Sequence, residues 1–306
     1  MAALMNNDIF IEVWNTVLFE KFLRFMHLLV EGLSSHSDAF LSRNLHPEGF
    51  RVLDIGCGFG DSTMQLAGNL GPSGEAVGVD CTANFIREAE ADASHKGVEN
   101  TGFMVADVER DDLQGPYDDA FARFGTMFFN LPGAAMNNIN KSLKPCGRRD
   151  MIVWRKWEDN PWLHDAELRV KEIVPVVSDE ETDQVHCGPG PFSMSGPDMV
   201  SEILKSTNFH QITFERHDSD ICIGRIIEES VYFAMALGPA GETIRLAGEE
   251  GERLQGEERS ALNETLSQFV RDDGVWGRHR HGLFQPPSLS LAHLAWEGVL
   301  GLLCLS

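Results

Sequence analysis

The sequence has few basic residues and no closely spaced cysteines. Its 25 Lys and Arg stand against 47 Asp and Glu, which gives a formal net charge of −22. A field of that sign repels nucleic-acid phosphates and anionic membrane surfaces, so we expect neither as a partner. The six cysteines form no C-x-x-C pair and no dense disulfide framework, which excludes the common zinc and redox motifs. Such thiols are typical of a cytoplasmic protein.

The sequence also lacks a long apolar run. The stretch from Val13 to Val30 is interrupted by Glu20, Lys21 and Arg24, and the opening MAALMNNDIF has neither the basic nor the apolar region of a signal peptide. We therefore expect no membrane span and a cytoplasmic location. With 42% hydrophobic and 24% charged residues, the composition is that of a globular protein.

Strand and helix patterns alternate between residues 51 and 157. Strands are predicted in VLDIG, AVGVD, GFMVADV, DDAFARF and MIVWRKW, and helices in DSTMQLAGNL, ANFIREAEADASHKG and GAAMNNINKSL. This order is typical of crossover units on a parallel sheet. The sequence therefore predicts an α/β protein with a Rossmann-like, mostly parallel sheet.

Three further regions surround or interrupt this core. Apolar residues recur at helical spacing between Val13 and Leu33, which predicts an N-terminal helical cap over residues 1–48. The core domain is predicted to span residues 49–276. It carries an irregular insertion at 158–200, after the fifth strand, and it is followed by an atypical C-terminal tail, residues 277–306.

The tail of residues 277–306 differs in composition from the rest of the chain. It contains the tripeptide HRH, the pair Pro286 and Pro287, and the apolar end LAWEGVLGLLCLS. Proline donates no hydrogen bond to a strand ladder, so we expect this segment not to supply a central strand and its removal to be tolerated. No third ligand is marked beside the two histidines of HRH, so no metal site is predicted.

The sharpest motif is the glycine-rich turn at residues 54–60. An apolar strand runs into Gly56, Gly58 and Gly60 directly before a helix. Glycine lets the backbone turn tightly and approach a ligand, and the following helix presents free N–H groups. Asp80, twenty residues past Gly60 at the end of the next strand, can accept hydrogen bonds from both hydroxyls of a ribose. Together these features predict a site for a nucleoside-type cofactor.

Two kinds of nucleoside cofactor fit this motif differently. A dinucleotide-binding turn has the spacing G-x-G-x-x-G, whereas the three glycines here alternate and Asp61 follows them. Phosphates are poor neighbours for Asp54 and Asp61, while the sulfonium and amino groups of S-adenosylmethionine are cationic. S-adenosylmethionine is therefore the predicted cofactor. A nicotinamide-dependent oxidoreductase is the alternative, and a catalytically inactive scaffold that keeps the fold is another.

Residues 50–157 resemble the class I S-adenosylmethionine-dependent methyltransferases, specifically a small-molecule branch similar to the ubiquinone and menaquinone biosynthesis methyltransferases. The resemblance implies that the D-x-G-x-G-x-G turn holds the methionine part of the cofactor and that Asp80 holds the ribose. It also implies that Asp107, in VADVE, faces the adenine amine. The cofactor-binding residues predicted from the motif, the resemblance and chain position are Asp54, Gly56, Cys57, Gly58, Gly60, Asp80, Cys81, Asp107 and Val108.

The resemblance implies transfer of a methyl group from S-adenosylmethionine to an O, N or C atom of a small, partly apolar molecule. We expect the insertion at 158–200, with the N-terminal helices, to cover the methyl donor and select the acceptor. A sulfonium methyl is already activated, so no catalytic motif is required. If the acceptor must lose a proton, His164 and His186 are the candidate bases, because both lie in the insertion.

Overall fold

The structure, a computed structural model, describes residues 7–43, 45–175, 189–277 and 289–295. The described residues fall into two compact units. A helical unit is drawn from Met1–Asp38, Trp154–Phe192 and His217–Leu289, and a sheet unit from Ala39–Val153, Ser193–Arg216 and Ser290–Ser306. His186, the HRH segment and the two tail prolines lie outside the described residues. The division into cap, core, insertion and tail remains a prediction.

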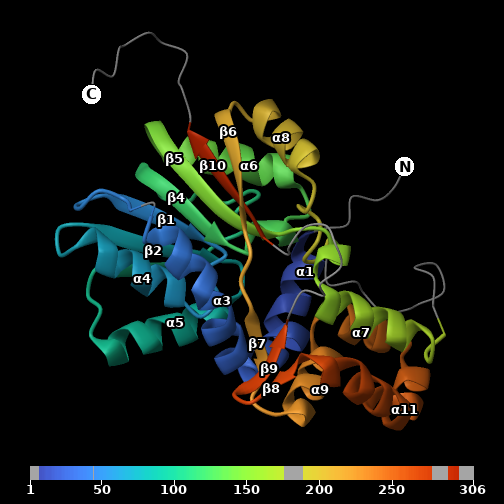
Figure 1. The fold of residues 1–306 in the computed structure, drawn as a ribbon. Helices are drawn as coiled ribbons and strands as arrows, with labels where there is room; N and C mark the ends of the chain where they lie inside the picture. Colours follow the sequence, from blue (N-terminus) through green and yellow to red (C-terminus); the bar gives the residue numbers. More distant parts are fainter. Residues whose placement is uncertain (1–6, 44, 176–188, 278–288, 296–306) are drawn as a thin grey trace. The chain divides into compact units, whose positions relative to one another are not determined.

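The sheet unit is built on a twisted, mostly parallel sheet. Its strands are β1 (Arg51–Ile55), β2 (Glu75–Asp80), β3 (Thr101–Val105), β4 (Tyr117–Arg123), β5 (Leu143–Trp154), β6 (His210–His217) and β10 (Leu289–Ala295). Within the described residues they lie in the order β3-β2-β1-β4-β5-β10-β6 (Figure 1). The β1–β2, β1–β4, β2–β3 and β4–β5 pairs are all parallel. The predicted α/β, Rossmann-like fold is thus confirmed.

Helices connect the strands of the sheet unit, as the alternating pattern predicts. They are α4 (Asp61–Leu70), α5 (Ala83–Lys96), α6 (Pro132–Ser142) and α8 (Pro197–Ser206), with the short 3-10 helix η2 (Thr126–Phe128) after β4. Pro132 and Pro197 occupy first helical positions, where a missing N–H costs nothing. Gly97 ends α5 in the left-handed conformation that favours glycine. These local signals place the helix ends that frame the sheet.

Strand β5 differs from its sequence expectation because it begins at Leu143 and carries charged residues into the interior. Arg149 is fully buried, with its guanidinium 3.9 Å from the ring centre of Phe209. Asp150 is also fully buried, and its Oδ2 lies 2.7 Å from Nε of Arg148. A cation–π contact and an ion pair therefore take the place of the apolar contacts expected in a central strand.

The tail supplies a strand of the sheet, which contradicts the expectation that it would not. β10 lies between β5 and β6 in the strand order. The tail prolines precede Leu289 in sequence, so the strand begins after them and its ladder needs no N–H from either. The expectation was wrong because the two prolines occupy only one part of the tail, and the strand is formed by residues that follow them.

The helical unit contains the remaining elements of the described chain. Its helices are α1 (Asn7–Val13), η1 (Trp14–Leu18), α2 (Phe19–Arg24), η3 (Trp157–Asp159), α7 (Pro161–Lys171), α9 (Ile227–Ala236), α10 (Gly238–Leu246), α11 (Glu249–Leu266) and η4 (Ser267–Phe269), while α3 (Met26–Leu41) crosses into the sheet unit. Its core includes the ring of Phe233, which stacks on Trp162 at 6.0 Å and meets Phe25 edge-on at 5.3 Å.

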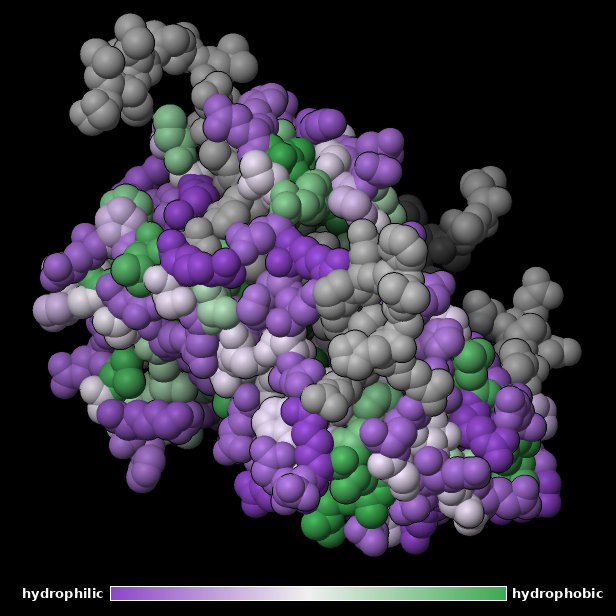
Figure 2. Space-filling model, in the orientation of Figure 1, coloured by the Kyte–Doolittle hydropathy of each residue, from purple (hydrophilic) through white to green (hydrophobic). Residues whose placement is uncertain are grey.

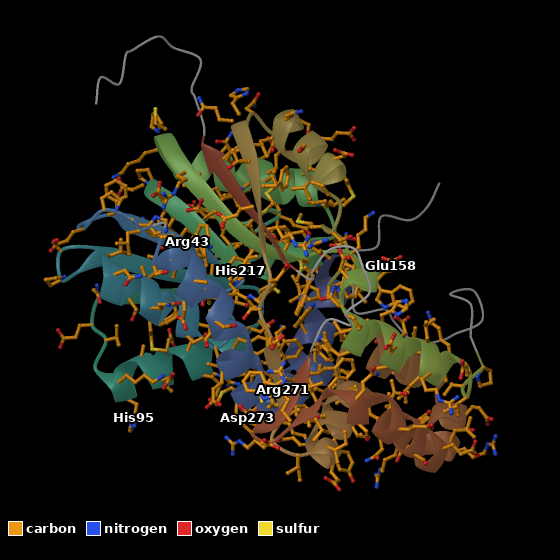
Figure 3. The ribbon with its side chains drawn as sticks, viewed as in Figure 1. Arg43, His95, Glu158, His217, Arg271 and Asp273 are labelled. Carbon is orange, nitrogen blue, oxygen red and sulfur yellow. The ribbon has the colours of Figure 1, made fainter. Side chains whose placement is uncertain are left out.

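A small second sheet completes the helical unit. It has the order β7-β9-β8, with β7 (Ile221–Gly224), β8 (Val270–Arg271) and β9 (Gly274–Gly277). The segment QITFERHDSDICI thus contributes to two strands, β6 and β7, which belong to two different sheets. Arg271 of β8, labelled in Figure 3, pairs with Asp220 just before β7.

The face shown in Figure 2 is mostly hydrophilic. In the part of the chain that the structure describes, no helix combines the length and the apolar character needed to cross a membrane.

Candidate functional site

The three glycines of the turn between β1 and α4 serve different geometric needs. All three have positive φ, at 66°, 52° and 77° for Gly56, Gly58 and Gly60. A Cβ on Gly56 would lie 2.7 Å from Cα of Gly125, and a Cβ on Gly60 would lie 2.7 Å from Cβ of Ala89. A Cβ on Gly58 would meet nothing within 4 Å. Gly58 therefore borders open space, where a ligand can approach the backbone closely.

The Asp80 carboxylate is fixed beside this open side of the turn. Its Oδ2 accepts a hydrogen bond from the Gly58 N–H at 3.1 Å, and its Oδ1 accepts one from the Thr82 N–H at 2.9 Å. Burial raises the pKa of Asp80, while these two N–H groups lower it. Each carboxylate oxygen has a second lone pair, so the group can still accept bonds from two hydroxyls. The turn and Asp80 thus fit the ribose of a nucleoside cofactor.

Asp54 connects the strand before the turn to the helix after it. Its Oδ2 accepts hydrogen bonds from the hydroxyls of Ser62 at 2.7 Å and Thr63 at 2.6 Å. Burial raises the pKa of Asp54 to about 6, against the lowering effect of these hydroxyls and of the Arg123 cation. The carboxyl is fully buried. Its two hydrogen bonds join β1 to the first turn of α4. The role of Ser62 and Thr63 was missed from the sequence, although two hydroxyls directly after a glycine turn are a usable signal.

The end of β4 packs against the glycine turn. Arg123, the last residue of β4, places Nη2 2.6 Å from Oδ2 of Asp61, the first residue of α4. Phe124 follows with a φ of 61°, which is strained for a bulky residue, and its N–H donates to the Ile152 carbonyl at 2.9 Å. The next residue is Gly125, which packs on Gly56. Sequence reasoning assigned no role to this corner.

The loop after β3 holds Asp107 in a network of its own. Oδ1 of Asp107 accepts a hydrogen bond from the Glu109 N–H at 3.0 Å, and Oδ2 lies 3.1 Å from Nε of Arg110. The carbonyl of Val108 accepts a hydrogen bond from Asn138 of α6 at 3.0 Å. Asp107 is therefore at least a turn carboxylate, and its contact with adenine remains a prediction.

Glu109 anchors the same loop to the segment that follows η2. Its Oε1 accepts a hydrogen bond from the Leu131 N–H at 3.0 Å, just before α6. Burial raises the pKa of Glu109, opposed by this N–H and that of Asn130. Sequence reasoning missed this anchor, because the partner is a backbone group distant in the chain.

The two cysteines near the turn are unreactive. Burial raises the pKa of Cys57 well above its ordinary value, and the Asp80 carboxylate adds to the effect. Burial and the same carboxylate raise the pKa of Cys81 to about 12. Both thiols stay neutral near pH 7, so neither acts as a nucleophile, and their contact with the cofactor remains a prediction.

His164, one of the two candidate bases, belongs to the helical unit. It lies on α7, with Nδ1 3.1 Å from Oδ1 of Asp165 and its ring centre 4.1 Å from that of Trp157. A carboxylate and an aromatic ring thus orient the imidazole. Its role as a base remains a prediction.

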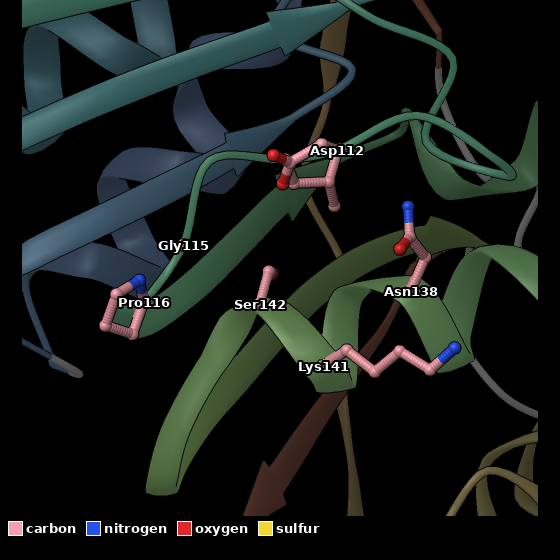
Figure 4. A pocket seen from close by; sticks show the side chains of 7 residues that line it. Asp112, Gly115, Pro116, Asn138, Lys141 and Ser142 are labelled. Atoms are coloured by element: carbon pink, nitrogen blue, oxygen red, sulfur yellow. The ribbon is translucent and has the colours of Figure 1, made fainter.

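A separate pocket lies at the opposite ends of the strands from the glycine turn. This cavity of about 300 Å³ is lined by Asp112, Leu113, Gly115, Pro116, Asn138, Lys141 and Ser142 (Figure 4). Pro116 precedes β4 and Ser142 precedes β5, so the pocket is at the strand starts, whereas the glycine turn follows a strand end. It contains none of the predicted cofactor residues. Among the described residues, no three His, Cys, Asp or Glu side chains are grouped to hold a metal ion.

Comparisons with known proteins agree on one family. Residues 46–172 match the family model of a methyltransferase domain. The chain is 31% identical over 124 residues to the 23S rRNA (uracil(1939)-C(5))-methyltransferase of Xylella fastidiosa. The aligned region covers 40% of this chain and 27% of that protein. It is 25% identical over 187 residues to nocamycin O-methyltransferase of Saccharothrix syringae, covering 56% and 64%.

A third relative comes from the group that the sequence motifs resemble. The ubiquinone/menaquinone biosynthesis C-methyltransferase of Pseudomonas paraeruginosa is 35% identical over 112 residues, covering 35% of this chain and 43% of that protein. The chain thus spans between about a quarter and two thirds of the length of these relatives.

The fold is shared with solved methyltransferase structures. Phosphoethanolamine N-methyltransferase 2 of Haemonchus contortus, in complex with S-adenosyl-L-methionine, superposes with a TM-score of 0.56 at 15% identity, covering 94% of this chain and 60% of that one. None of the proteins compared above is an oxidoreductase. The resemblance to class I, S-adenosylmethionine-dependent methyltransferases is thus confirmed, with the family match over residues 46–172.

Proposed function

We propose that this chain transfers a methyl group from S-adenosylmethionine to an O, N or C atom of a small, partly apolar molecule. The observation that carries the proposal is the open side of Gly58 with the Asp80 carboxylate fixed beside it. A left-handed glycine with open space at its Cβ position, next to an acceptor for two hydroxyls, suits a nucleoside that lies against the backbone.

The proposed cofactor contacts follow the carboxyl ends of β1, β2 and β3. Gly56 to Gly60, with Asp54 and Cys57 behind them, hold the methionine part, and Asp80 holds the ribose. Asp107, Val108 and Cys81 surround the adenine. When bound, S-adenosylmethionine supplies a methyl group that is already activated by its sulfonium charge, so the chain has to position the donor and exclude water.

The acceptor is proposed to be selected by the insertion at 158–200 together with the N-terminal helices. His164 or His186 receives the proton that an O–H, N–H or C–H acceptor releases as the new bond to the methyl carbon forms. The hydrogen-bond distance from His164 to Asp165 supports His164, because a carboxylate holds one tautomer of the imidazole.

A small molecule is preferred to RNA as the acceptor. One relative is named as a 23S rRNA methyltransferase, and its alignment covers 40% of this chain. A net charge of −22 repels an RNA backbone. Two other relatives are named as a nocamycin O-methyltransferase and as a ubiquinone/menaquinone biosynthesis C-methyltransferase. We infer a cytoplasmic enzyme with no nucleic-acid or membrane partner, in keeping with the free thiols of Cys57, Cys81, Cys146 and Cys222.

Methyl transfer from labelled S-adenosylmethionine tests the proposal. The full chain is incubated with a panel of phenols, quinols, amines and acidic C–H compounds, and with an RNA pool. We expect label in one class of small molecule and none in RNA. Label in RNA alone would overturn the proposed acceptor class, and cofactor binding without transfer to any acceptor would favour the inactive scaffold. A His164→Ala variant that retains full transfer at every pH would remove His164 from the reaction.

A further inference from the structure

The glycine turn is surrounded by acids, yet the proposed cofactor carries an acid of its own. Asp54, Asp61 and Asp80 all lie on or beside the turn. They suit the sulfonium and amino groups of S-adenosylmethionine, but the carboxylate of its methionine part needs a donor of opposite charge. The N-terminus of α4 supplies only a partial positive charge, and the first residue of this helix is itself an acid, Asp61.

Arg123 brings a cation to this turn. In the sheet, Asp54 of β1 is level with Phe121 of β4, so Arg123, two residues further on, is level with Gly56. Its side chain is only 9% exposed, and Nη2 lies 2.6 Å from Oδ2 of Asp61, whose side chain is 19% exposed. The same cation lowers the pKa of Asp54. Arg123 is thus held at the turn by its ion pair with Asp61.

We propose that Arg123 binds the carboxylate of the methionine part of S-adenosylmethionine, beside its ion pair with Asp61. A guanidinium has five N–H donors in a planar fork, so one arginine can serve two carboxylates at once. Asp61 contacts one Nη of the guanidinium, and the cofactor carboxylate is assigned to other N–H donors of the same fork. This assignment rests on the proposed function of the chain.

The competing explanation is that the ion pair merely fastens β4 to α4. The two explanations differ in which part of the ligand Arg123 senses. A fastening pair shapes the whole turn, so its loss weakens every adenosine ligand alike. A carboxylate-binding arginine affects only ligands that carry the amino-acid part.

Calorimetry with two ligands separates these explanations. S-adenosylhomocysteine carries the amino-acid part, and 5′-methylthioadenosine lacks it. We expect Arg123→Gln to weaken S-adenosylhomocysteine binding about 10- to 100-fold, with 5′-methylthioadenosine changed less than about twofold. Arg123→Lys should recover part of the loss, because it keeps the charge without the fork.

Two further variants keep the test decisive if Arg123→Gln folds poorly. Asp61→Asn removes the carboxylate charge that competes with the cofactor for Arg123, so S-adenosylhomocysteine should bind as well as to the wild type or more tightly. Arg51→Gln is the matched control, because Arg51 forms an ion pair of the same length, 2.6 Å, with Glu75 at the opposite ends of the strands. It should leave both affinities unchanged.

The outcomes are distinct. Equal weakening of both ligands by Arg123→Gln, or weakening of S-adenosylhomocysteine by Asp61→Asn to the same extent, would overturn the assignment and leave the proposed function intact. A folded wild-type chain that binds neither ligand would overturn the proposed function and this inference with it.

Discussion

Gly56 and Gly125 pack backbone against backbone, which joins the two corners of the proposed site. A Cβ on Gly56 would lie 2.7 Å from Cα of Gly125, and a Cβ on Gly125 would lie 2.6 Å from the carbonyl oxygen of Ile55. No side chain fits at either position without a shift of the main chain. The turn after β1 and the corner after β4 therefore hold each other in place before any ligand arrives.

Substitution of Gly58 by alanine should impair ligand binding more than folding. The residue has a φ of 52° and open space at the Cβ position, so alanine costs about 1 kcal/mol in the free energy of unfolding from backbone strain. The added methyl group occupies the space where the cofactor backbone contact is proposed. Isothermal titration with S-adenosylhomocysteine should show affinity lower by about tenfold or more.

Gly97→Ala is the matched control for this change. Gly97 also has a left-handed φ, 67°, with nothing within 4 Å of its Cβ position, but it ends α5. It should lose similar stability and keep full affinity. Equal affinities for the two variants would show that no ligand approaches Gly58.

Asp54→Asn should change the pH dependence of stability. The folded pKa, about 6, lies above the unfolded value of 3.8 because burial disfavours the charge. The favourable contribution of Asp54 is therefore present below pH 3.8 and is lost as the pH rises through about 6. The amide cannot ionise, so its unfolding free energy relative to wild type should rise by up to about 3 kcal/mol between pH 4 and pH 7.

Urea unfolding at several pH values measures this difference. Asp92→Asn on α5 is the control, because its exposed carboxylate forms a surface ion pair with Lys96. A constant difference between Asp54→Asn and wild type across this range would contradict the raised pKa.

Arg149→Met should stabilise the protein. The guanidinium is fully buried, burial lowers its pKa to about 9, and its Nε and Nη2 find no hydrogen-bond acceptor within the described structure. A methionine of similar length keeps the contact with Phe209 and removes the cost of desolvation, for a gain of about 1–3 kcal/mol in unfolding free energy.

The neighbouring Arg148 provides the contrast. Arg148→Met leaves the buried Asp150 without its ion pair, so it should cost about 3 kcal/mol or more. Chemical denaturation of both variants tests the pair of predictions. A loss of stability in Arg149→Met as large as that in Arg148→Met would show that both cations are needed.

A chain that stops at Gly277 should be less stable than the full chain. It lacks β10, so β5 and β6 keep unpaired edges inside the sheet. We expect a lower melting temperature and a tendency to associate, measured by circular dichroism and light scattering. A chain that stops at Ala295 retains β10 and serves as the control. Equal melting temperatures for the two shortened chains would show that β10 adds nothing.

The parallel core was predictable because its signals are local. VLDIG and AVGVD are continuous apolar runs, as expected for strands covered on both faces, and β1 and β2 match them within a residue or two. The glycines and Asp80 stand at fixed offsets from these strands. Their positions relative to one another follow from the crossover rule.

Other features depend on contacts between distant segments, which local patterns do not encode. Arg149 is tolerated in β5 because Phe209, from another part of the chain, covers it. The position of β10 depends on β5 and β6, two strands that lie far from it in the sequence. Arg123 and Gly125 gain their importance only because β4 lies next to β1.

The most direct test of the central claim is calorimetric titration of the folded chain with S-adenosylhomocysteine, in the wild type, Asp80→Ala and Glu75→Ala. Asp80 and Glu75 stand at opposite ends of β2, so only Asp80 borders the glycine turn. The account predicts one site in the wild type, a loss of about 1.5–3 kcal/mol in Asp80→Ala and no change in Glu75→Ala. No binding to the folded wild type, or equal affinity in all three, would contradict it.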